Sequence, residues 1–568
     1  MKRRIAGDDA PRLVDEALGA LLRRLDPATP AEVAAAASGA SRAVDAGHAG
    51  LQLAEDGGGT ALADALRRSR WVDAPAAAAV ADPARPLVLE RGLLYLRRYR
   101  EYERRLAAGL RRLAAAPGSG DPLPEDLFGR LFPDAAPDDR QAEAARHVAA
   151  HRLLLVTGGP GTGKTTTVAR MLALLAGQRL AAGGPPPRFA LAAPTGRAAE
   201  RMAGSVRAAV ARMRDAGVDP RVCDALPTDA RTLHRLLGSR GQGPGFRHDA
   251  DHPLQHDVVV VDEASMVDLP LMCKLVEAVP DGARLVLLGD PDQLPAVEAG
   301  DVLAAMVASS GAGVLRGRRV HLVRGYRTSA GLQLAPLADA VRAGDGDAAL
   351  DLLAGGGLDG VHWHEGADPL QSTGLRQALL GPWEALATAT DPVEALRVAG
   401  RQRLLTALRV GPSGAAATND AIEAALAGPR RDRYFHGRLL LVTENSYRHG
   451  LFNGDIGICL RDAGGATVAW FPGGAADAVR GFHPAALPAH AGAFAMTVHK
   501  AQGSEFDRAW VVLPPEDHPL LSRELLYTAL TRARESLHLS ARSDVLRATL
   551  GRGVRRVSGL GWRLLDAS

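Results

Sequence analysis

A glycine-rich loop at residues 158–165, with the sequence GGPGTGKT, constrains the fold of this chain more than any other feature. The loop fits the pattern G-x-x-x-x-G-K-[ST], follows an apolar run at residues 153–156 and leads into a segment with helical character. A strand, a glycine-rich turn and a helix in this order let backbone N–H groups surround phosphates. The sequence therefore predicts an α/β domain that binds a nucleotide. The residues expected to line the nucleotide are Gly158, Gly159, Pro160, Gly161, Thr162, Gly163, Lys164, Thr165 and Thr166.

Two acidic residues supply the second part of a phosphate-transfer site. Asp262 and Glu263 directly follow the apolar run at residues 258–261. We expect Asp262 to hold Mg²⁺ together with the hydroxyl of Thr165. Glu263 would orient or deprotonate the attacking water, and Lys164 would contact the β- and γ-phosphates. An apolar run before two acids is a weak signal alone, but with the phosphate loop it predicts ATP hydrolysis.

Beyond about residue 125, short apolar runs alternate with alanine-rich segments of helical character. This alternation predicts a parallel sheet covered by helices, with functional sites at the carboxyl ends of the strands. Gln293 follows one such run and is a candidate sensor of the γ-phosphate, although an ordinary Asp-Pro turn is the alternative interpretation. The runs expected as strands of the first sheet are residues 153–156, 189–192, 258–261 and 285–288. Those expected in a second sheet lie near residues 320–323, 404–408, 509–513 and 537–539.

The expected domain boundaries follow from these changes in local composition and apolar spacing. Residues 125–310 form a first α/β domain, with a small polar excursion at 239–257. Residues 311–429 and 491–568 form a second one, and a glycine-rich stretch at 430–490 is a small all-β insertion between its parts.

Residues 1–115 have the composition of a helical N-terminal domain, and the segment PGSGDPLP at 117–124 is expected to be a linker. Apolar residues recur at helical spacing between Tyr99 and Leu113, with arginines between them. These arginines either form a basic surface for DNA or a partner, or are the solvated face of a core helix. They are Arg97, Arg98, Arg100, Arg104, Arg105, Arg111 and Arg112.

Composition excludes several classes of protein. The 568 residues carry a net charge of only +4, with 46% hydrophobic and 23% charged residues, which is typical of a globular protein. Cys223, Cys273 and Cys459 lie far apart, which argues against a zinc site, a disulfide framework or a four-cysteine iron–sulfur cluster. Because no secretory signal or membrane-spanning run is evident, we expect a cytoplasmic protein without a membrane partner.

The order and wording of the motifs resemble the RecD family, the α subunits of RecBCD enzymes (exodeoxyribonuclease V), within superfamily 1 helicases of the 5′→3′ branch. The resemblance covers residues 140–540, and PLVLERGLLYLRRY at 86–99 extends it into the N-terminal region. The segments that carry it are GGPGTGKTTTVA, APTGRAAERM, TLHRLLG, DEAS, GDPDQLP, GYR, LFNGDIG, VHKAQGSEF and LYTALTRA. It implies two RecA-like P-loop motor domains with ATP and Mg²⁺ between them, an SH3-like β insertion at 430–490 and a duplex-splitting pin at 239–257.

The resemblance also assigns roles to single residues. Gln141 would contact the adenine edge and Tyr326 could stack on its ring, with core packing as the alternative for Tyr326. Arg327 and Arg532 would act as arginine fingers. The departures from the family pattern are Thr328, where an aromatic residue is common, and Ala501, where Ser is usual. Further residues near the nucleotide would be Gly503 and Glu505. Residues that would face single-stranded DNA are Pro194, Thr195, Thr232, His234, Asn453, Thr497 and His499.

The sequence thus predicts an ATP-dependent 5′→3′ DNA helicase that is a subunit of a RecBCD-type helicase–nuclease in double-strand break repair and recombination. The expected partners are single-stranded and duplex DNA, a RecB-like subunit that carries the nuclease centre and a RecC-like subunit that binds residues 1–115. Three alternatives stay open: a free-standing 5′→3′ helicase, an ATP-gated structural subunit of a nuclease complex, and RNA as the track.

Overall fold

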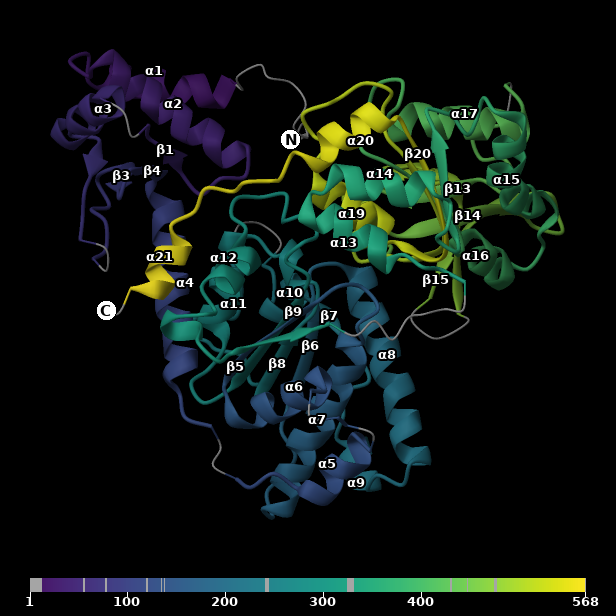
Figure 1. Cartoon of the computed structure of the whole chain (residues 1–568), viewed down its shortest axis with the longest axis horizontal. Coiled ribbons are helices and arrows are strands. Elements are labelled where there is room, and N and C mark those ends of the chain that lie inside the picture. Colours follow the sequence, from purple (N-terminus) through teal and green to yellow (C-terminus); the bar gives the residue numbers. More distant parts are fainter. Residues whose placement is uncertain are drawn as a thin grey trace. The chain divides into compact units, whose positions relative to one another are not determined.

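The computed structural model describes residues 13–54, 57–76, 79–118, 121–133, 135–136, 138–240, 245–323, 331–429, 432–446, 448–473 and 478–566. The chain divides into two compact units. Unit 1 comprises Met1–Pro291, Pro295–Tyr326 and Arg555–Ser568, and unit 2 comprises Asp292–Leu294 and Arg327–Val554. Each unit is a mixed α/β structure built on a parallel sheet (Figure 1).

The sheet of unit 1 has the strand order β10-β5-β9-β8-β6-β7, and all its strands are parallel. Its four inner strands contain runs of Val, Leu and Ala because both of their faces are buried. This confirms the predicted runs of the first sheet. The bounds are β5 (Leu153–Gly158), β6 (Phe189–Ala193), β7 (Arg231–Thr232), β8 (Val258–Val261), β9 (Arg284–Gly289) and β10 (Arg319–Leu322).

Alternate side chains of these strands enter two separate cores. Leu154, Val156 and Leu288 pack under one set of helices, and Leu153, Leu155 and Leu287 under the other. The first set is α5 (Glu125–Leu131), α6 (Arg140–Ala150), α7 (Lys164–Ala181), α8 (Gly196–Asp215) and α9 (Pro220–Asp224). The second is α4 (Arg97–Ala115), α10 (Leu233–Leu237), η1 (Ala264–Met266), α11 (Leu269–Ala278), α12 (Val302–Ala308), η2 (Gly313–Leu315) and α21 (Leu560–Leu565).

The N-terminal region contains a sheet as well as helices, which corrects the expectation of a purely helical domain. Its strands are ordered β1-β4-β3-β2. Strands β3 (Leu87–Glu90) and β4 (Leu93–Leu96) pair antiparallel across a turn in which Arg91 and Gly92 both have positive φ, the backbone typical of a tight hairpin. The hairpin was missed because its strands are continuously apolar instead of alternating. The other elements are α1 (Leu13–Leu25), α2 (Ala31–Asp45), β1 (Leu51–Gln52), α3 (Gly57–Arg68) and β2 (Val72–Asp73).

The arginines of α4 bind other parts of unit 1, which favours the core-helix interpretation over the basic surface. The apolar face of α4 packs against α11, and Arg105 Nε lies 2.5 Å from Glu277 Oε1. Arg112 donates to Asp281 and to the carbonyl oxygens of Val276 and Val279. The positive charge of this helix is therefore largely balanced within the chain.

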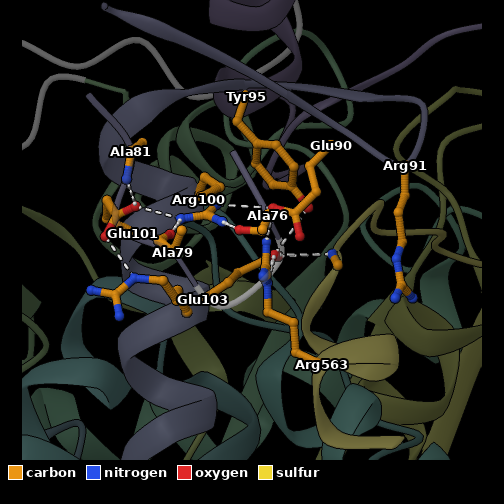
Figure 2. Close-up of polar contacts among 12 residues, drawn as sticks. Ala76, Ala79, Ala81, Glu90, Arg91, Tyr95, Arg100, Glu101, Glu103 and Arg563 are labelled. Carbon is orange, nitrogen blue, oxygen red and sulfur yellow. Dashed lines mark hydrogen bonds and ion pairs between the residues drawn. The ribbon is translucent and has the colours of Figure 1, made fainter. Parts of the chain in front are cut away.

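A buried network of charged residues joins α4, β3 and the C-terminal helix α21 (Figure 2). Glu90 Oε2 accepts hydrogen bonds from Arg100 Nε at 2.9 Å and from Arg563 Nη2 at 2.5 Å. Glu103 accepts from the Tyr95 hydroxyl at 3.0 Å and from the backbone N–H of Gly559 at 2.9 Å. The four charged side chains of this network are buried, and burial raises the pKa of Glu103.

The sheet of unit 2 has the strand order β11-β20-β19-β12-β18 and is also parallel. The strands are β11 (Val361–Glu365), β12 (Gln402–Thr406), β18 (Ala495–Thr497), β19 (Phe506–Val512) and β20 (Ala533–Ala541). The helical elements are α13 (Ala335–Ala343), α14 (Gly346–Ala354), α15 (Thr373–Glu384), η3 (Ala385–Thr388), α16 (Pro392–Gly400), α17 (Ala415–Ala427), α18 (Val498–Ala501), α19 (Arg523–Leu530) and α20 (Ser543–Leu550).

An antiparallel sheet with the order β16-β15-β14-β13-β17 lies between α17 and β18 in the sequence. One face of β13 packs on the main core of unit 2 through Leu439 and Leu441, and the other encloses a small core with Phe471. The elements are β13 (Leu439–Val442), β14 (Ile456–Arg461), β15 (Thr467–Pro472), β16 (Val479–Phe482), η4 (Pro484–Ala486) and β17 (His490–Gly492).

Three segments belong to a different unit from the one expected, and the shortest is Asp292–Leu294, which groups with unit 2. Strand β10, expected near 320–323 in the second sheet, pairs with β5 at the edge of the first. Residues after Val554, expected in the second domain, group with unit 1, where Leu560 and Leu564 enter the core beside α4. These groupings could not be predicted from the spacing of apolar residues, because that spacing indicates a buried strand or helix but not the sheet or core that it joins. Within the described residues, every helix is too short or too polar to cross a membrane.

Stacked rings cross three strands of the unit 2 sheet. His538 lies between Trp510 and His362, with ring centroids at 4.0 Å and 4.6 Å. His364 Nε2 lies 3.1 Å from His538 Nδ1. Burial, together with the charges of His362, His364 and Arg508, lowers the pKa of His538 from 6.5 to about 3.

We expect the stability of unit 2 to fall as the pH drops below about 6.5. Above that pH His538 is neutral in both the folded and the unfolded chain, so it adds no pH dependence. Between pH 6.5 and about 3 the unfolded chain takes up a proton that folded His538 does not. Thermal unfolding at pH 7 and pH 5 should show a smaller loss for His538→Phe, which keeps an aromatic ring but does not titrate. An equal loss in both chains would contradict this assignment.

Arg563→Ala should destabilise unit 1 by about 3–5 kcal/mol, because Glu90 and Glu103 would stay buried with one cation fewer. Arg67→Ala is the matched control, since Arg67 forms an exposed ion pair with Asp64 in the same unit and such pairs contribute at most about 1 kcal/mol. Differential scanning calorimetry of the two variants would measure both effects. Equal shifts would show that the buried network does not hold α21 in place.

Candidate nucleotide and DNA sites

The phosphate loop connects β5 to α7 at the carboxyl edge of the unit 1 sheet. Gly161 and Gly163 have φ of 81° and 80°, a left-handed backbone that favours glycine. Lys164 Nζ donates to the carbonyl oxygens of Gly158 at 2.6 Å and Gly159 at 3.0 Å. Thr165 and Thr166 lie half-buried in the first turn of α7. The loop therefore has the backbone that phosphate binding requires.

Gln141 is fixed beside this loop by both ends of its amide. Its Nε2 donates to the carbonyl oxygen of Thr162 at 3.1 Å, and its Oε1 accepts from Arg170 at 3.2 Å. Asp139 caps α6 and accepts the backbone N–H of Gln141 at 2.8 Å. Gln141, the residue expected to contact adenine, therefore also hydrogen-bonds the phosphate loop.

Asp262 and Glu263 follow β8 at the same edge of the sheet. The Asp262 carboxylate is buried and accepts the backbone N–H of Glu263 at 2.9 Å. Burial and the neighbouring Glu263 raise the pKa of Asp262, while Arg201 and Lys164 oppose that rise. A carboxylate and a threonine hydroxyl are ligands suited to Mg²⁺ bound with a nucleotide, so Asp262 and Thr165 are the residues that could hold it. In the part of the chain that the structure describes, no cluster of three or more His, Cys, Asp or Glu could form a separate metal centre.

Arg201 is a residue of this site that sequence reasoning missed. It lies on α8, and its Nη2 donates to Glu263 Oε1 in an ion pair. The side chain of Glu263 is only 8% exposed, and its φ of 54° is unusual for a residue other than glycine. The motif APTGRAAERM contains Arg201, but nothing in the sequence indicates which strand end its helix faces.

Gln293 and Arg532 both belong to unit 2. Asp292–Leu294 group with this unit, where the backbone N–H of Leu294 donates to Thr528 Oγ1 at 2.8 Å. Arg532 follows α19, is 1% exposed and donates to the carbonyl oxygens of Thr528 and Ser504. Its guanidinium is therefore held in one orientation by backbone groups.

The segment after α18 carries the remaining residues expected near the nucleotide. Gly503 has a φ of 72°, and Glu505 accepts from Arg534 Nε at 3.2 Å. Lys500, at the end of α18, is half-buried, and burial and Arg409 lower its pKa. Tyr326 and Arg327 lie outside the described residues, as does Thr328.

Three threonines expected to face DNA have a common local role, because each caps the helix that follows it. Thr195 Oγ1 accepts from Ala198 N at 3.2 Å on α8, and Thr232 Oγ1 accepts from Arg235 N at 3.3 Å on α10. Thr497 Oγ1 accepts from Lys500 N at 3.3 Å on α18. Because a cap uses the hydroxyl oxygen as an acceptor, its O–H can still donate to a phosphate. Strands β6 and β7 are parallel neighbours, so Thr195 and Thr232 lie at the same edge of the sheet.

The other residues expected to face DNA lie on the surface or close to it. His234 is exposed, with its ring 5.8 Å from that of Phe246, which belongs to the 239–257 excursion. Asn453 is exposed between β13 and β14, while Pro194 and His499 are half-buried. Ser239 and Phe246 form an antiparallel bridge at the base of the excursion.

Two family models match the chain. The model of an AAA domain matches residues 141–299, and the model of the UvrD-like helicase C-terminal domain matches residues 492–540. These ranges contain the phosphate loop with Asp262 and Glu263, and the α18–α19 region of unit 2.

Similar curated proteins carry helicase names. The RecBCD enzyme subunit RecD of Mycobacterium tuberculosis is 43% identical, and the match covers 85% of this chain and 82% of the relative. The RecD subunit of Mycolicibacterium smegmatis is 40% identical over 88% of this chain and 87% of the relative. The ATP-dependent RecD2 DNA helicase of Deinococcus radiodurans is 32% identical, over 78% of this chain and 54% of the relative.

Proposed function

Because the chain belongs to the RecD family of superfamily 1 helicases, we propose that it is an ATP-dependent 5′→3′ DNA helicase subunit of a RecBCD-type helicase–nuclease. The observation that carries this proposal is the phosphate loop and the Asp262–Glu263 pair at one edge of a single parallel sheet. The relatives named as RecBCD subunits match along most of their length, whereas RecD2 matches over about half of its length. This difference favours the subunit over a free-standing helicase.

The chain's own residues divide the work of ATP hydrolysis. The N–H groups of the loop and Lys164 would bind the phosphates, and Thr165 with Asp262 would hold Mg²⁺, which would neutralise the developing charge. Glu263 orients or deprotonates the water, and Gln293 senses the γ-phosphate. Arg327 and Arg532 are the proposed arginine fingers, a role that a permanently charged planar cation suits. Gln141 and Tyr326 would contact adenine, and Gly503 and Glu505 would lie near the nucleotide.

The DNA track is proposed to run over the helix caps at Thr195, Thr232 and Thr497. Hydroxyls and first-turn N–H groups bind phosphates without reading bases, which suits a motor that moves along any sequence. Pro194, His234, Asn453 and His499 would complete this surface.

The finer domain assignments are also proposals. We propose that the two units are RecA-like motor domains, that 430–490 is an SH3-like insertion and that 239–257 is a pin. The five-strand order β16-β15-β14-β13-β17 and its separate small core support an independent β module for the insertion.

We propose that a RecB-like subunit supplies DNA cleavage and that a RecC-like subunit binds the N-terminal region. Support for the second proposal comes from α1, where Val14, Leu21 and Leu25 are 66%, 48% and 62% exposed and share one helix face. Helix α4 is unsuited to this role, since its apolar residues already pack on α11. Deletion of residues 1–115 would therefore expose the core of unit 1 and cannot test docking.

Lys164→Ala should abolish ATP hydrolysis and leave DNA binding nearly unchanged, because the ammonium group contacts phosphates and not the predicted DNA surface. Steady-state ATP turnover and binding to an oligonucleotide measure the two effects. Arg179→Ala, near the far end of the same helix, is the control and should retain turnover. Turnover by Lys164→Ala at a tenth of the wild-type rate or more would refute the phosphate-loop assignment.

Strand displacement should require a 5′ tail on the duplex, show little dependence on base sequence and weaken steeply as salt rises. The assay compares 5′-tailed with 3′-tailed duplexes, using the chain alone and the chain with RecB-like and RecC-like subunits. Movement from a 3′ tail would overturn the branch assignment but not the motor. Metal-dependent DNA cleavage by the purified chain alone would overturn the assignment of the nuclease to another subunit.

Leu21→Glu combined with Leu25→Glu should abolish co-purification with a RecC-like subunit, because two charges would enter an apolar contact. ATP turnover of the free chain should not change, since α1 lies far in the sequence from the phosphate loop and forms part of a separate small core. The matched control is Arg23→Glu, on the opposite side of the same helix. Unchanged complex formation by the double variant would place the docking surface elsewhere.

A further inference from the structure

The ion pair between Arg201 and Glu263 joins two functional regions of unit 1. Arg201 Nη2 donates to Glu263 Oε1, with the Glu263 side chain 8% and the Arg201 side chain 25% exposed. The contact is therefore largely shielded from water, where a charged hydrogen bond is stronger than at the surface. Glu263 is the residue proposed to act on the attacking water.

The helix that carries Arg201 begins at the proposed DNA surface. Thr195 caps α8 and Gly196 is its first residue, so Arg201 lies within the second turn. The Thr195 cap bonds Ala198, so a displacement of Thr195 is passed to the first turn of α8. A strand bound at Pro194 and Thr195 would thus act on the helix whose second turn carries the contact with Glu263.

The chemistry of Glu263 conflicts with this ion pair. A carboxylate oxygen that accepts a guanidinium hydrogen bond is less available to accept one from water, and a general base must lie within hydrogen-bond reach of the proton that it takes. Glu263 also has a left-handed backbone, a conformation that costs of order 1 kcal/mol and persists only where neighbouring groups hold it. Two of those neighbours are Asp262, which accepts the Glu263 N–H, and Arg201.

We propose that Arg201 is a positioning residue that restrains Glu263 until DNA binds at the N-terminus of α8. This inference rests on the proposed ATPase function and adds to it a coupling between DNA and hydrolysis within unit 1. A strand at Pro194 and Thr195 shifts α8, Arg201 releases Glu263, and the carboxylate becomes free to bind the attacking water. A purely structural ion pair would instead contribute to stability alone.

The test measures ATP kcat and KM with and without oligo-dT for the wild type, Arg201→Ala and Arg201→Lys. Arg201→Ala should raise the DNA-free kcat by about tenfold or more, since a positioned base contributes roughly 10²- to 10⁴-fold. The DNA-stimulated kcat and the KM for ATP should stay near the wild-type values, so the stimulation ratio collapses. Arg201→Lys keeps the positive charge and should restore part of the restraint.

Two further variants separate the inference from its alternatives. Adding Glu263→Gln to Arg201→Ala should remove the raised DNA-free turnover, which assigns that turnover to Glu263. Arg207→Ala is the matched control on α8, because Arg207 donates to the exposed carbonyl oxygen of Thr228 and is not paired with Glu263. It should behave as the wild type.

The outcomes are distinguishable. An equal fall of kcat with and without DNA, or no change in either, would overturn the restraint by Arg201. A lower melting temperature with an unchanged stimulation ratio would show a structural ion pair only, and would overturn it too. Absence of ATP turnover in the wild type would instead refute the proposed function.

Discussion

The parallel pairing of β5, β9, β8 and β6 determines where the candidate residues of unit 1 lie. Parallel strands present all their carboxyl ends at one edge of the sheet, and the strands here are buried on both faces. The phosphate loop, the Asp262–Glu263 pair and the Thr195 cap each follow one of these strands. Residues far apart in the sequence are thereby brought to one edge without any direct contact that sequence could reveal.

This constraint explains what sequence could and could not predict. Four of the six strands of the first sheet, β5, β6, β8 and β9, were predictable because their apolar runs are short, continuous and followed by polar loops. The site residues were predictable where one motif contains both the chemical group and its turn, as in Gly158–Thr165. The membership of β10 and α21 in unit 1 was not predictable, because burial of an apolar segment does not indicate its neighbours. Arg201 was missed for a related reason, since its role depends on the direction in which α8 faces.

Ion pairing between distant elements is a second reason why the local sequence could not show which arginines are available to bind DNA or a partner. The arginines of α4 resemble a nucleic-acid surface when read as a string, yet Arg100, Arg105 and Arg112 bind Glu90, Glu277 and Asp281. Their acidic partners come from other elements, so a net charge of +4 says little about where positive potential remains. The buried network around Glu103 also explains why the N-terminal region and α21 form one body with the first sheet. Breaking a buried charge pair costs far more than its formation gains, which fixes the partners of each charged group.

The same rule governs the charged groups proposed to act on ATP. A charged side chain that is shielded from water needs a partner both with and without ligand bound. Without a ligand, the chain itself supplies that partner. Lys164 Nζ is bound by the carbonyl oxygens of Gly158 and Gly159, and Glu263 is bound by Arg201. A ligand can engage either group only by replacing an internal hydrogen bond of similar strength. Phosphates replace the partners of Lys164 directly, because they bind in the same loop. Glu263 differs, since its partner sits on a helix whose first turn lies at the proposed DNA surface, and so its release depends on a second ligand. In this proposal hydrolysis depends on DNA because α8 begins at the proposed DNA surface and its Arg201 side chain contacts Glu263.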